Sequence, residues 1–172
     1  MEFQNKEFEL KTFKNENFTD KSFENSNFID CVFEDCNLSN VNLVNTKIQN
    51  CNFKNCKILG LNFSNCTKFL FSFTFENCLI SMSDFSDLDL KDTIFKSCQI
   101  FDCHFLKTNL IKVEFEDSNL RGSRFENANL SFASFKTAKN YSIDPNQNIL
   151  KKTKFSIPEV VGLLDIFDIK LE

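Results

Sequence analysis

Three kinds of side chain in this sequence could take part in chemistry: thiols, an imidazole and clustered carboxylates. The chain has 172 residues and a single histidine, His104. Four carboxylates crowd into one short stretch, at Asp84, Asp87, Asp89 and Asp92. The eight cysteines are Cys31, Cys36, Cys51, Cys56, Cys66, Cys78, Cys98 and Cys103. Thiols and imidazoles serve as metal ligands, nucleophiles or bases, and carboxylates supply acid–base chemistry or negative charge.

The motifs that usually accompany such chemistry are missing from the sequence. It has no glycine-rich phosphate loop, no serine nucleophile elbow and no histidine pair spaced to bind a metal. The acidic pairs Glu34-Asp35 and Glu116-Asp117, like His104, fall at positions that the repeat described next directs outward or into turns. The sequence therefore predicts a non-enzymatic protein with no catalytic residue, no metal site and no cofactor.

A large apolar residue occupies every fifth position along most of the chain. One run extends from Phe3 to Phe63 and a second from Phe75 to Phe135, and all 26 positions hold Phe, Leu or Ile. A helix would give a period near 3.6 and a strand a period of 2, so neither explains the pattern. A strict short repeat sustained over this length indicates a solenoid architecture.

A second inward position lies two residues before each large one and holds smaller side chains. All eight cysteines fall at this position, which predicts that they are buried and behave as small hydrophobic residues. Cysteines 20 residues apart, such as Cys31 and Cys51, would stack on neighbouring coils, close enough for a disulfide. Because we expect a cytosolic protein, we expect reduced thiols.

Turn-forming residues mark the corners between these units. Two residues after the large residue, eleven of 13 positions in the first run hold Asn or Asp and one holds Gly. These residue types tolerate positive φ and bond their own backbone in turns. Four such units, each an extended piece followed by a corner, would close a square coil.

In the second run, Phe alternates with Leu or Ile without exception from Phe75 to Phe135. With four units in each coil, this alternation puts Phe on two opposite faces. The first predicted column contains Phe75, Phe95, Phe115 and Phe135, and the second contains Phe85, Phe105 and Phe125. Such columns would fill the interior and leave no cavity for a ligand.

The repeat units also follow a known consensus. Units such as Cys36-Asn37-Leu38-Ser39-Asn40 and Cys51-Asn52-Phe53-Lys54-Asn55 match the pattern Ala-(Asp/Asn)-Leu-x-x. Over residues 1–140 the chain resembles pentapeptide-repeat proteins. The resemblance implies an all-β solenoid, a right-handed quadrilateral parallel β-helix of about seven coils stacked at about 4.8 Å. Residues 141–172 would then form a C-terminal cap.

The repeat is interrupted once, at residues 64–74, where two more residues lie between Phe63 and Phe75 than the period requires. The interruption is either a bulge in the coil or a loop that contacts a partner. Phe69, Leu70 and Phe71 are the candidate contact residues of such a loop, because they cannot all point inward.

Both ends of the repeat need protection, because a β-helix leaves strand edges and core open there. At the N-terminus the smaller inward position holds Lys6, Lys11, Glu16 and Lys21, which predicts a poorly filled first coil of low stability. At the C-terminus, Ser156 and Glu159 form a capping-box pattern that predicts a short helix over about residues 157–167, and Phe155 could staple onto Val160.

This C-terminal helix would close the last coil and has more apolar residues than a lid needs. In the quinolone-resistance proteins that the chain resembles, the C-terminal helical segment forms a homodimer. The resemblance therefore implies a two-fold dimer, the alternative being a monomer with a plain cap. The expected interface residues are Val160, Leu163, Leu164, Phe167 and Ile169.

Within the family, the chain is similar to the Qnr and MfpA quinolone-resistance proteins and the McbG microcin-immunity protein. The similarity lies in Cys56-Lys57-Ile58-Leu59-Gly60 and in Ile143-Asp144-Pro145 before the helix. It implies action on DNA gyrase or topoisomerase IV, in which outward carboxylates mimic DNA phosphates and occupy the basic DNA-binding surface. The role would be drug resistance or toxin immunity. The cluster Asp84, Asp87, Asp89 and Asp92 is the candidate contact patch, or else a solvated flank.

The net charge of −4 is divided into bands along the chain. Residues 1–35 carry −5, residues 36–75 +4, residues 76–117 −5, residues 118–154 +5 and residues 155–172 −3. A banded rod imitates DNA less closely than a uniformly acidic one. The alternative function is therefore a protein-binding scaffold with no topoisomerase role, acting through residues 68–72 or the basic band.

The composition excludes several further classes of protein. With 23 Phe, three Gly and two Pro, the chain is not a flexible low-complexity segment. We find no signal-peptide pattern and no apolar stretch long enough to span a bilayer, so we expect a cytoplasmic protein without membrane contact. The basic band lacks an aromatic stacking platform, and direct nucleic-acid binding is not expected.

Overall fold

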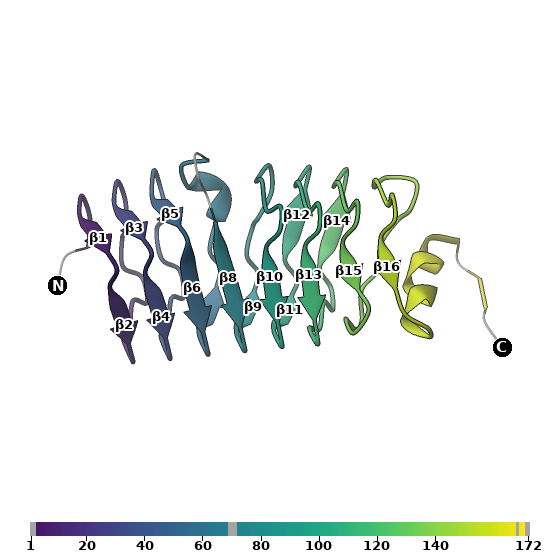
Figure 1. Ribbon diagram of the computed structural model, residues 1–172, viewed down its shortest axis with the longest axis horizontal. Coiled ribbons are helices and arrows are strands. Elements are labelled where there is room, and N and C mark those ends of the chain that lie inside the picture. The colour runs from purple at the N-terminus through teal and green to yellow at the C-terminus, as the bar shows by residue number, and fades with distance from the viewer. Residues whose placement is uncertain (1–2, 69–71, 168, 171–172) are drawn as a thin grey trace.

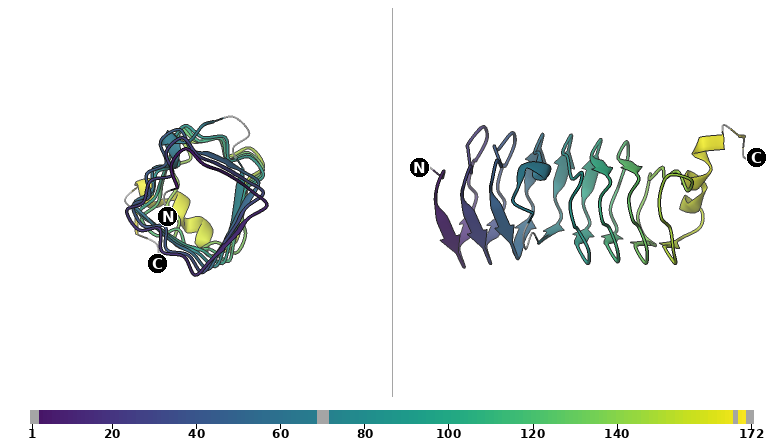
Figure 2. Two further views of the ribbon diagram at one scale, coloured as in Figure 1. Left: turned by 90° about the vertical axis from the view of Figure 1, so that its left-hand side faces the viewer. Right: turned by 90° about the horizontal axis from the view of Figure 1, so that it is seen from above.

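The computed structural model describes residues 3–68, 72–167 and 169–170, and these residues form a rod (Figure 1). The chain winds into a right-handed quadrilateral parallel β-helix of about seven coils, which confirms the fold predicted from the repeat. Viewed along the rod, successive coils superimpose as nested squares (Figure 2). The first coil and the C-terminal helical turns lie at opposite ends of the rod.

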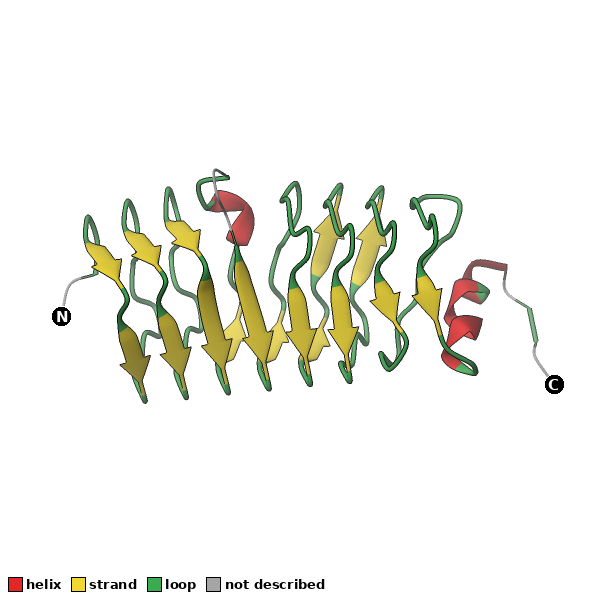
Figure 3. Ribbon diagram, viewed as in Figure 1, coloured by secondary structure: helices red, strands yellow, loops and turns green. Residues whose placement is uncertain are grey.

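Short parallel strands form four ladders along the sides of the rod (Figure 3). The longest ladder contains β2 (Thr12–Lys14), β4 (Val32–Glu34), β6 (Cys51–Lys54), β8 (Phe73–Glu76), β10 (Ile94–Lys96), β13 (Glu114–Glu116), β15 (Ser134–Phe135) and β16 (Lys154–Phe155). A second contains β1 (Glu7–Glu9), β3 (Asn27–Ile29) and β5 (Lys47–Gln49). The others contain β7 (Lys57–Leu59), β9 (Leu79–Ser81) and β11 (Gln99–Phe101), and β12 (His104–Leu106) and β14 (Arg124–Glu126).

The corners have the backbone conformation that their residue types favour. At every predicted corner from Asn5 to Gly60, φ lies between 50° and 67°. Side chains in one corner column also bond along the rod: the amide of Asn25 donates to Asn5 Oδ1 at 3.3 Å, and that of Asn45 donates to Asn25 Oδ1 at 3.3 Å. Asn and Asp therefore supply both the left-handed turn and part of the contact between coils.

Stacked phenylalanine rings fill the interior, as the alternation predicts. One column follows the eight-stranded ladder, with adjacent ring centroids 4.9 to 5.4 Å apart. Its members are Phe13, Phe33, Phe53, Phe75, Phe95, Phe115, Phe135 and Phe155. On the opposite side, Phe105 lies 5.1 Å from Phe85 and 4.9 Å from Phe125. The two columns meet edge to face. Each ring pair stabilises the fold by about 0.5–1.5 kcal/mol beyond the contribution of its buried area.

All eight cysteines are buried, which confirms their predicted inward orientation, and all are free thiols in the structure. Six of the Sγ atoms bond a backbone carbonyl of the preceding coil; Cys51 Sγ, for example, donates to the carbonyl of Phe28 at 3.4 Å. Burial raises the pKa of the Cys51 and Cys103 thiols to about 12. These two thiols therefore pack as small core residues and are poorly suited to nucleophilic chemistry at neutral pH.

The interruption of the repeat lies at one corner, between Thr67 and Ser72. Residues that pair between coils are 20 apart on either side of the interruption, but across it β6 pairs with β8 and β7 pairs with β9 at a separation of 22. The regular hydrogen bonding between coils continues to Thr67, whose N–H donates to the carbonyl of Thr46. It resumes at Ser72, whose N–H donates to the carbonyl of Ile48. Phe73 is buried against Phe63 and Phe75. The candidate contact residues Phe69, Leu70 and Phe71 lie outside the described residues.

The β-helix continues past residue 140, where a cap was expected to begin. β16 adds to the ladder beyond β15, and Tyr141 and Ile143 are buried in the last coil. Phe155 belongs to β16 and stacks on Phe135 at 5.4 Å, rather than leading directly into a helix. The extension was missed because the five-residue apolar pattern fades after Phe135.

The C-terminal lid consists of two 3₁₀ helices, η2 (Glu159–Leu163) and η3 (Asp165–Phe167), instead of one helix over residues 157–167. The predicted capping box is wrong, because η2 starts after Pro158 and no side chain caps it, which leaves Ser156 outside the first turn. Gly162 is buried, and its carbonyl accepts a bond from the N–H of Ile143 at 3.3 Å. Seen end-on, the lid crosses the opening of the coils (Figure 2).

Charged side chains cover the opposite end of the rod. Lys6, Lys11, Glu16 and Lys21 are exposed in the first coil, at the position that holds small buried residues in later coils. Lys11 Nζ lies 5.2 Å from the ring centroid of Phe8 and 4.9 Å from that of Phe13. A lysine held over aromatic rings protects an open end from pairing with another strand. The low stability expected for this coil stays a prediction.

Candidate functional site

The predicted acidic cluster is distributed around one coil rather than gathered in one pocket. Asp84 and Asp89 lie on consecutive sides of the coil, and their carboxylates bond the backbone within it. Asp84 Oδ1 accepts from the N–H of Ser86 at 2.9 Å, and Asp89 Oδ1 accepts from the N–H of Lys91 at 3.2 Å. These two aspartates therefore shape turns, which uses part of their capacity to bind a partner.

Asp87 and Asp92 occupy the corners that follow, with φ of 57° and 59°, and both are exposed. Asp92 lies 3.9 Å from Lys91 Nζ, while no salt bridge involves Asp87 within the described part of the chain. Asp87 and Asp92 are the two members of the cluster exposed at corners, Asp87 without an ion pair among the described residues and Asp92 beside Lys91. The structure thus narrows the candidate patch to two adjacent corners.

The outer face of the eight-stranded ladder is largely neutralised by ion pairs between coils. Lys14 pairs with Glu34 at 2.9 Å, Lys54 with Glu76 at 3.8 Å and Lys96 with Glu116 at 3.8 Å. Lys136, 20 residues after Glu116, has no salt bridge among the described residues. These ion pairs offset part of the negative charge on this face, while Glu114 on β13 (Glu114–Glu116) has no salt bridge among the described residues.

The chemistry available to the site is electrostatic. His104 is exposed on β12, as predicted. Among the residues that the structure describes, no three His, Cys, Asp or Glu side chains converge as a metal site would require. Likewise, no helix in the described ranges has the length and apolarity needed to cross a membrane. What the arrangement offers a ligand is charge and a rigid surface.

The five predicted dimer residues divide into two groups. Leu163 packs against the core and Val160 is half-buried, so both belong mainly to the lid. Leu164, Phe167 and Ile169 are exposed, with 36%, 55% and 53% of their surface accessible. Sequence reasoning missed Ile157, Val161 and Ile166, which are also exposed apolar residues of this segment. A helix with 3.0 residues per turn turns outward different residues from those of an α-helix, which is why they were missed.

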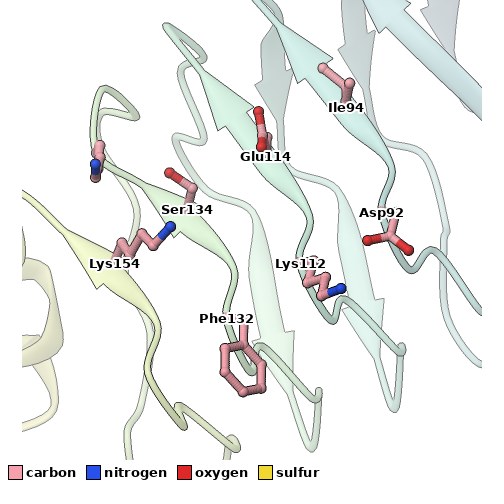
Figure 4. Close-up of a pocket in the computed structure, with 8 residues that line it drawn as sticks. Asp92, Ile94, Lys112, Glu114, Phe132, Ser134 and Lys154 are labelled. Carbon is pink, nitrogen blue, oxygen red and sulfur yellow. The ribbon is translucent and has the colours of Figure 1, made fainter.

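A groove near the C-terminal end of the eight-stranded ladder was also missed. It has a volume of about 570 Å³. Figure 4 shows Phe132, Lys112 and Lys154 along it. The sequence held one signal of it, because Phe132 stands at a corner position where Asn and Asp predominate.

Comparison with known proteins identifies the repeat and the fold. A family model described as pentapeptide repeat region matches residues 6–69 and 68–143. Two trypsin-treated forms of QnrB1, a plasmid-mediated fluoroquinolone resistance protein, cover 99% of this chain and 92% of their own, with TM-scores of 0.53 and 0.52 and identities of 18% and 19%. HetL, from the cyanobacterium Nostoc, covers 91% of this chain and 90% of its own, with a TM-score of 0.47 and 10% identity. No curated protein sequence matches the chain significantly.

Proposed function

Because the chain belongs to the pentapeptide-repeat family, we propose that it is a non-enzymatic cytoplasmic protein that binds DNA gyrase or topoisomerase IV. It would do so by imitating DNA, and would protect the enzyme from inhibitors such as quinolones or a peptide toxin. The fold that it shares with QnrB1, a fluoroquinolone resistance protein, supports this choice of partner.

The observation that carries the proposal is the pair of exposed corner carboxylates at Asp87 and Asp92 on a rod with a filled interior. A type II topoisomerase binds DNA through a basic surface, which attracts negative charge held at fixed positions. Since stacked coils hold these corners rigidly, binding would require little ordering of the protein. Asp87 and Asp92 lie in the band of residues 76–117, which carries −5, as does the band of residues 1–35.

A supercoiling assay with purified gyrase, with and without a fluoroquinolone, tests the proposal. The wild-type protein should inhibit supercoiling or rescue it from the drug at near-stoichiometric amounts. The variant Asp87→Asn with Asp92→Asn should lose most of this effect, since Asn keeps the left-handed corner and removes only the charge. The matched control, Asp20→Asn with Asp35→Asn, makes the same change at two other exposed corners and should act like wild type.

We also propose that two copies associate through the lid. Leu164, Phe167 and Ile169 expose apolar surface at the end of the rod, beyond what closing the coil uses. Exposed apolar groups gathered at one end favour a two-fold contact that buries them. A dimer would double the length of the rod available to imitate DNA.

A protein-binding scaffold without a topoisomerase role is the second candidate. The observation that favours it is the alternation of negative and positive bands, which suits partners of mixed charge better than a uniform DNA site. If the protein has no effect on gyrase or topoisomerase IV from its own host, in either format of the assay, this scaffold function is the one to pursue.

A further inference from the structure

The groove near the C-terminal end of the eight-stranded ladder runs parallel to the rod. One wall is a corner column in which Asp92, Lys112, Phe132 and Lys152 occupy successive coils, each with positive φ. The other wall is a strand column in which Ile94, Glu114, Ser134 and Lys154 lie in register. Four coils at the parallel-strand spacing span about 14 Å, the length of about four extended residues. The groove therefore has the dimensions of a short peptide segment.

Phe132 is an unusual residue for its position. It has φ of 63° and is 41% exposed, and it is the one aromatic residue among the described corners with positive φ. The left-handed conformation is unfavourable for an L-residue with a Cβ. Lys152 Nζ lies 5.9 Å from its ring centroid. A strained, exposed aromatic side chain beside a cation contributes little to the core, which points to a role in binding.

The groove also gathers positive charge that the protein itself does not neutralise. The lysines around it are Lys112, Lys136, Lys152 and Lys154, and all four are exposed. Within the described ranges, none of them lies within salt-bridge distance of a carboxylate, unlike the paired lysines earlier on the same face. The ion-pair ladder ends here because Ser156 follows Lys136 one coil later, where an acid would be needed.

We propose that this groove binds a short acidic peptide segment of a partner protein, one that carries an aromatic or large aliphatic side chain among its carboxylates. The carboxylates would pair with the lysines, and the apolar side chain would lie against Phe132. This binding goes beyond the topoisomerase contact, which uses carboxylates of this chain and not its lysines.

The groove's own charges favour a peptide over a nucleic acid. Glu114 stands among the lysines, and Asp92 lies at one end of the groove. An unbroken row of phosphates would be repelled by both, whereas a peptide can place a neutral or basic residue opposite each. The net charge of −4 also opposes non-specific attraction of nucleic acid.

Selection from a random dodecapeptide library displayed on phage tests this assignment. The library is selected on immobilised wild-type protein while a soluble variant, Phe132→Asn with Lys136→Glu and Lys154→Glu, competes for other sites. The enriched peptide is then labelled and titrated by fluorescence anisotropy. Asn relieves the strain at the corner and the lysines are exposed, so the variant should keep the fold, which circular dichroism checks.

We expect enriched sequences to combine several acids with an aromatic or large aliphatic residue. Their affinity should fall about tenfold or more in Phe132→Asn and in the double lysine variant, and it should weaken with added salt. Lys47→Glu with Lys57→Glu, an equal charge change on other sides of the rod, should bind like wild type. The proposal is overturned if no peptide discriminates wild type from the variant, or if single-stranded oligothymidylate binds the groove and no acidic peptide does. Neither of these two outcomes depends on whether the protein binds gyrase.

Discussion

Replacing Phe105 with alanine removes a ring from the centre of the stacked interior. Phe105 is fully buried, with its centroid 5.1 Å from that of Phe85 and 4.9 Å from that of Phe125. Burying a phenylalanine takes about 200 Å² out of water, which is worth about 5 kcal/mol at about 25 cal/mol per Å². Alanine retains part of that area, but the cavity and four lost ring contacts add to the cost. We therefore expect a loss of about 4–5 kcal/mol.

Urea unfolding followed by circular dichroism measures this change in the free energy of unfolding. Phe105→Asp should prevent folding altogether, because it adds a buried unpaired charge. The control is Lys107→Asp, two residues away at an exposed corner with φ of 52°, which Asp tolerates; its effect should stay within about 0.5 kcal/mol. Similar losses from Phe105→Ala and Lys107→Asp would show that the assigned orientation of the repeat is wrong.

Three further predictions concern the lid, the dimer and the thiols. Gly162→Ala should lower the unfolding temperature by several degrees, since its Cβ would lie 2.2 Å from the carbonyl oxygen of Tyr141; an unchanged temperature would show that the lid does not pack on the last coil. Leu164→Asp should halve the mass measured by light scattering, and a mass equal to that of wild type would reject the proposed interface. The free energy of unfolding should stay constant below pH 9.0, the ordinary thiol pKa, and should fall as the pH rises towards 12. In that range burial keeps the thiols of Cys51 and Cys103 protonated in the folded protein, while the same thiols ionise in the unfolded chain. The slope is about 1.4 kcal/mol per pH unit for each thiol, and Cys51→Ala should reduce it in urea titrations between pH 8 and 11; a slope unaffected by Cys51→Ala would contradict this origin.

The sequence was sufficient for the architecture because each side chain in the repeat has one physical role. Phe and Leu lattices specify the interior, and Asn at positions such as Asn25 and Asn45 specifies left-handed corners. Prediction failed where residues depart from this repeat pattern. At Tyr141 and Ile143 the core is filled out of period, and at Pro158 the lid starts later than the capping pattern indicates.

The candidate site was harder to predict than the fold, because the period gives each residue's orientation but not its local bonds. The period predicts that the side chains of Asp84 and Asp87 both point outward. In the structure, Asp84 accepts a hydrogen bond from the backbone of Ser86, whereas Asp87 lies at the corner that follows. The groove at Phe132 depends on residues 20 apart in adjacent coils, which becomes visible only when the coils are stacked.

Competition with DNA tests most directly whether the protein acts by imitating it. A fluorescent DNA duplex bound to gyrase would be titrated with wild-type protein and with Asp87→Asn, Asp92→Asn, while anisotropy reports the bound DNA. DNA mimicry predicts that the wild-type protein displaces the duplex, that displacement weakens as salt rises, and that the variant displaces it poorly. If the protein binds gyrase and leaves the duplex in place, or does not bind gyrase at all, the mimicry mechanism is wrong.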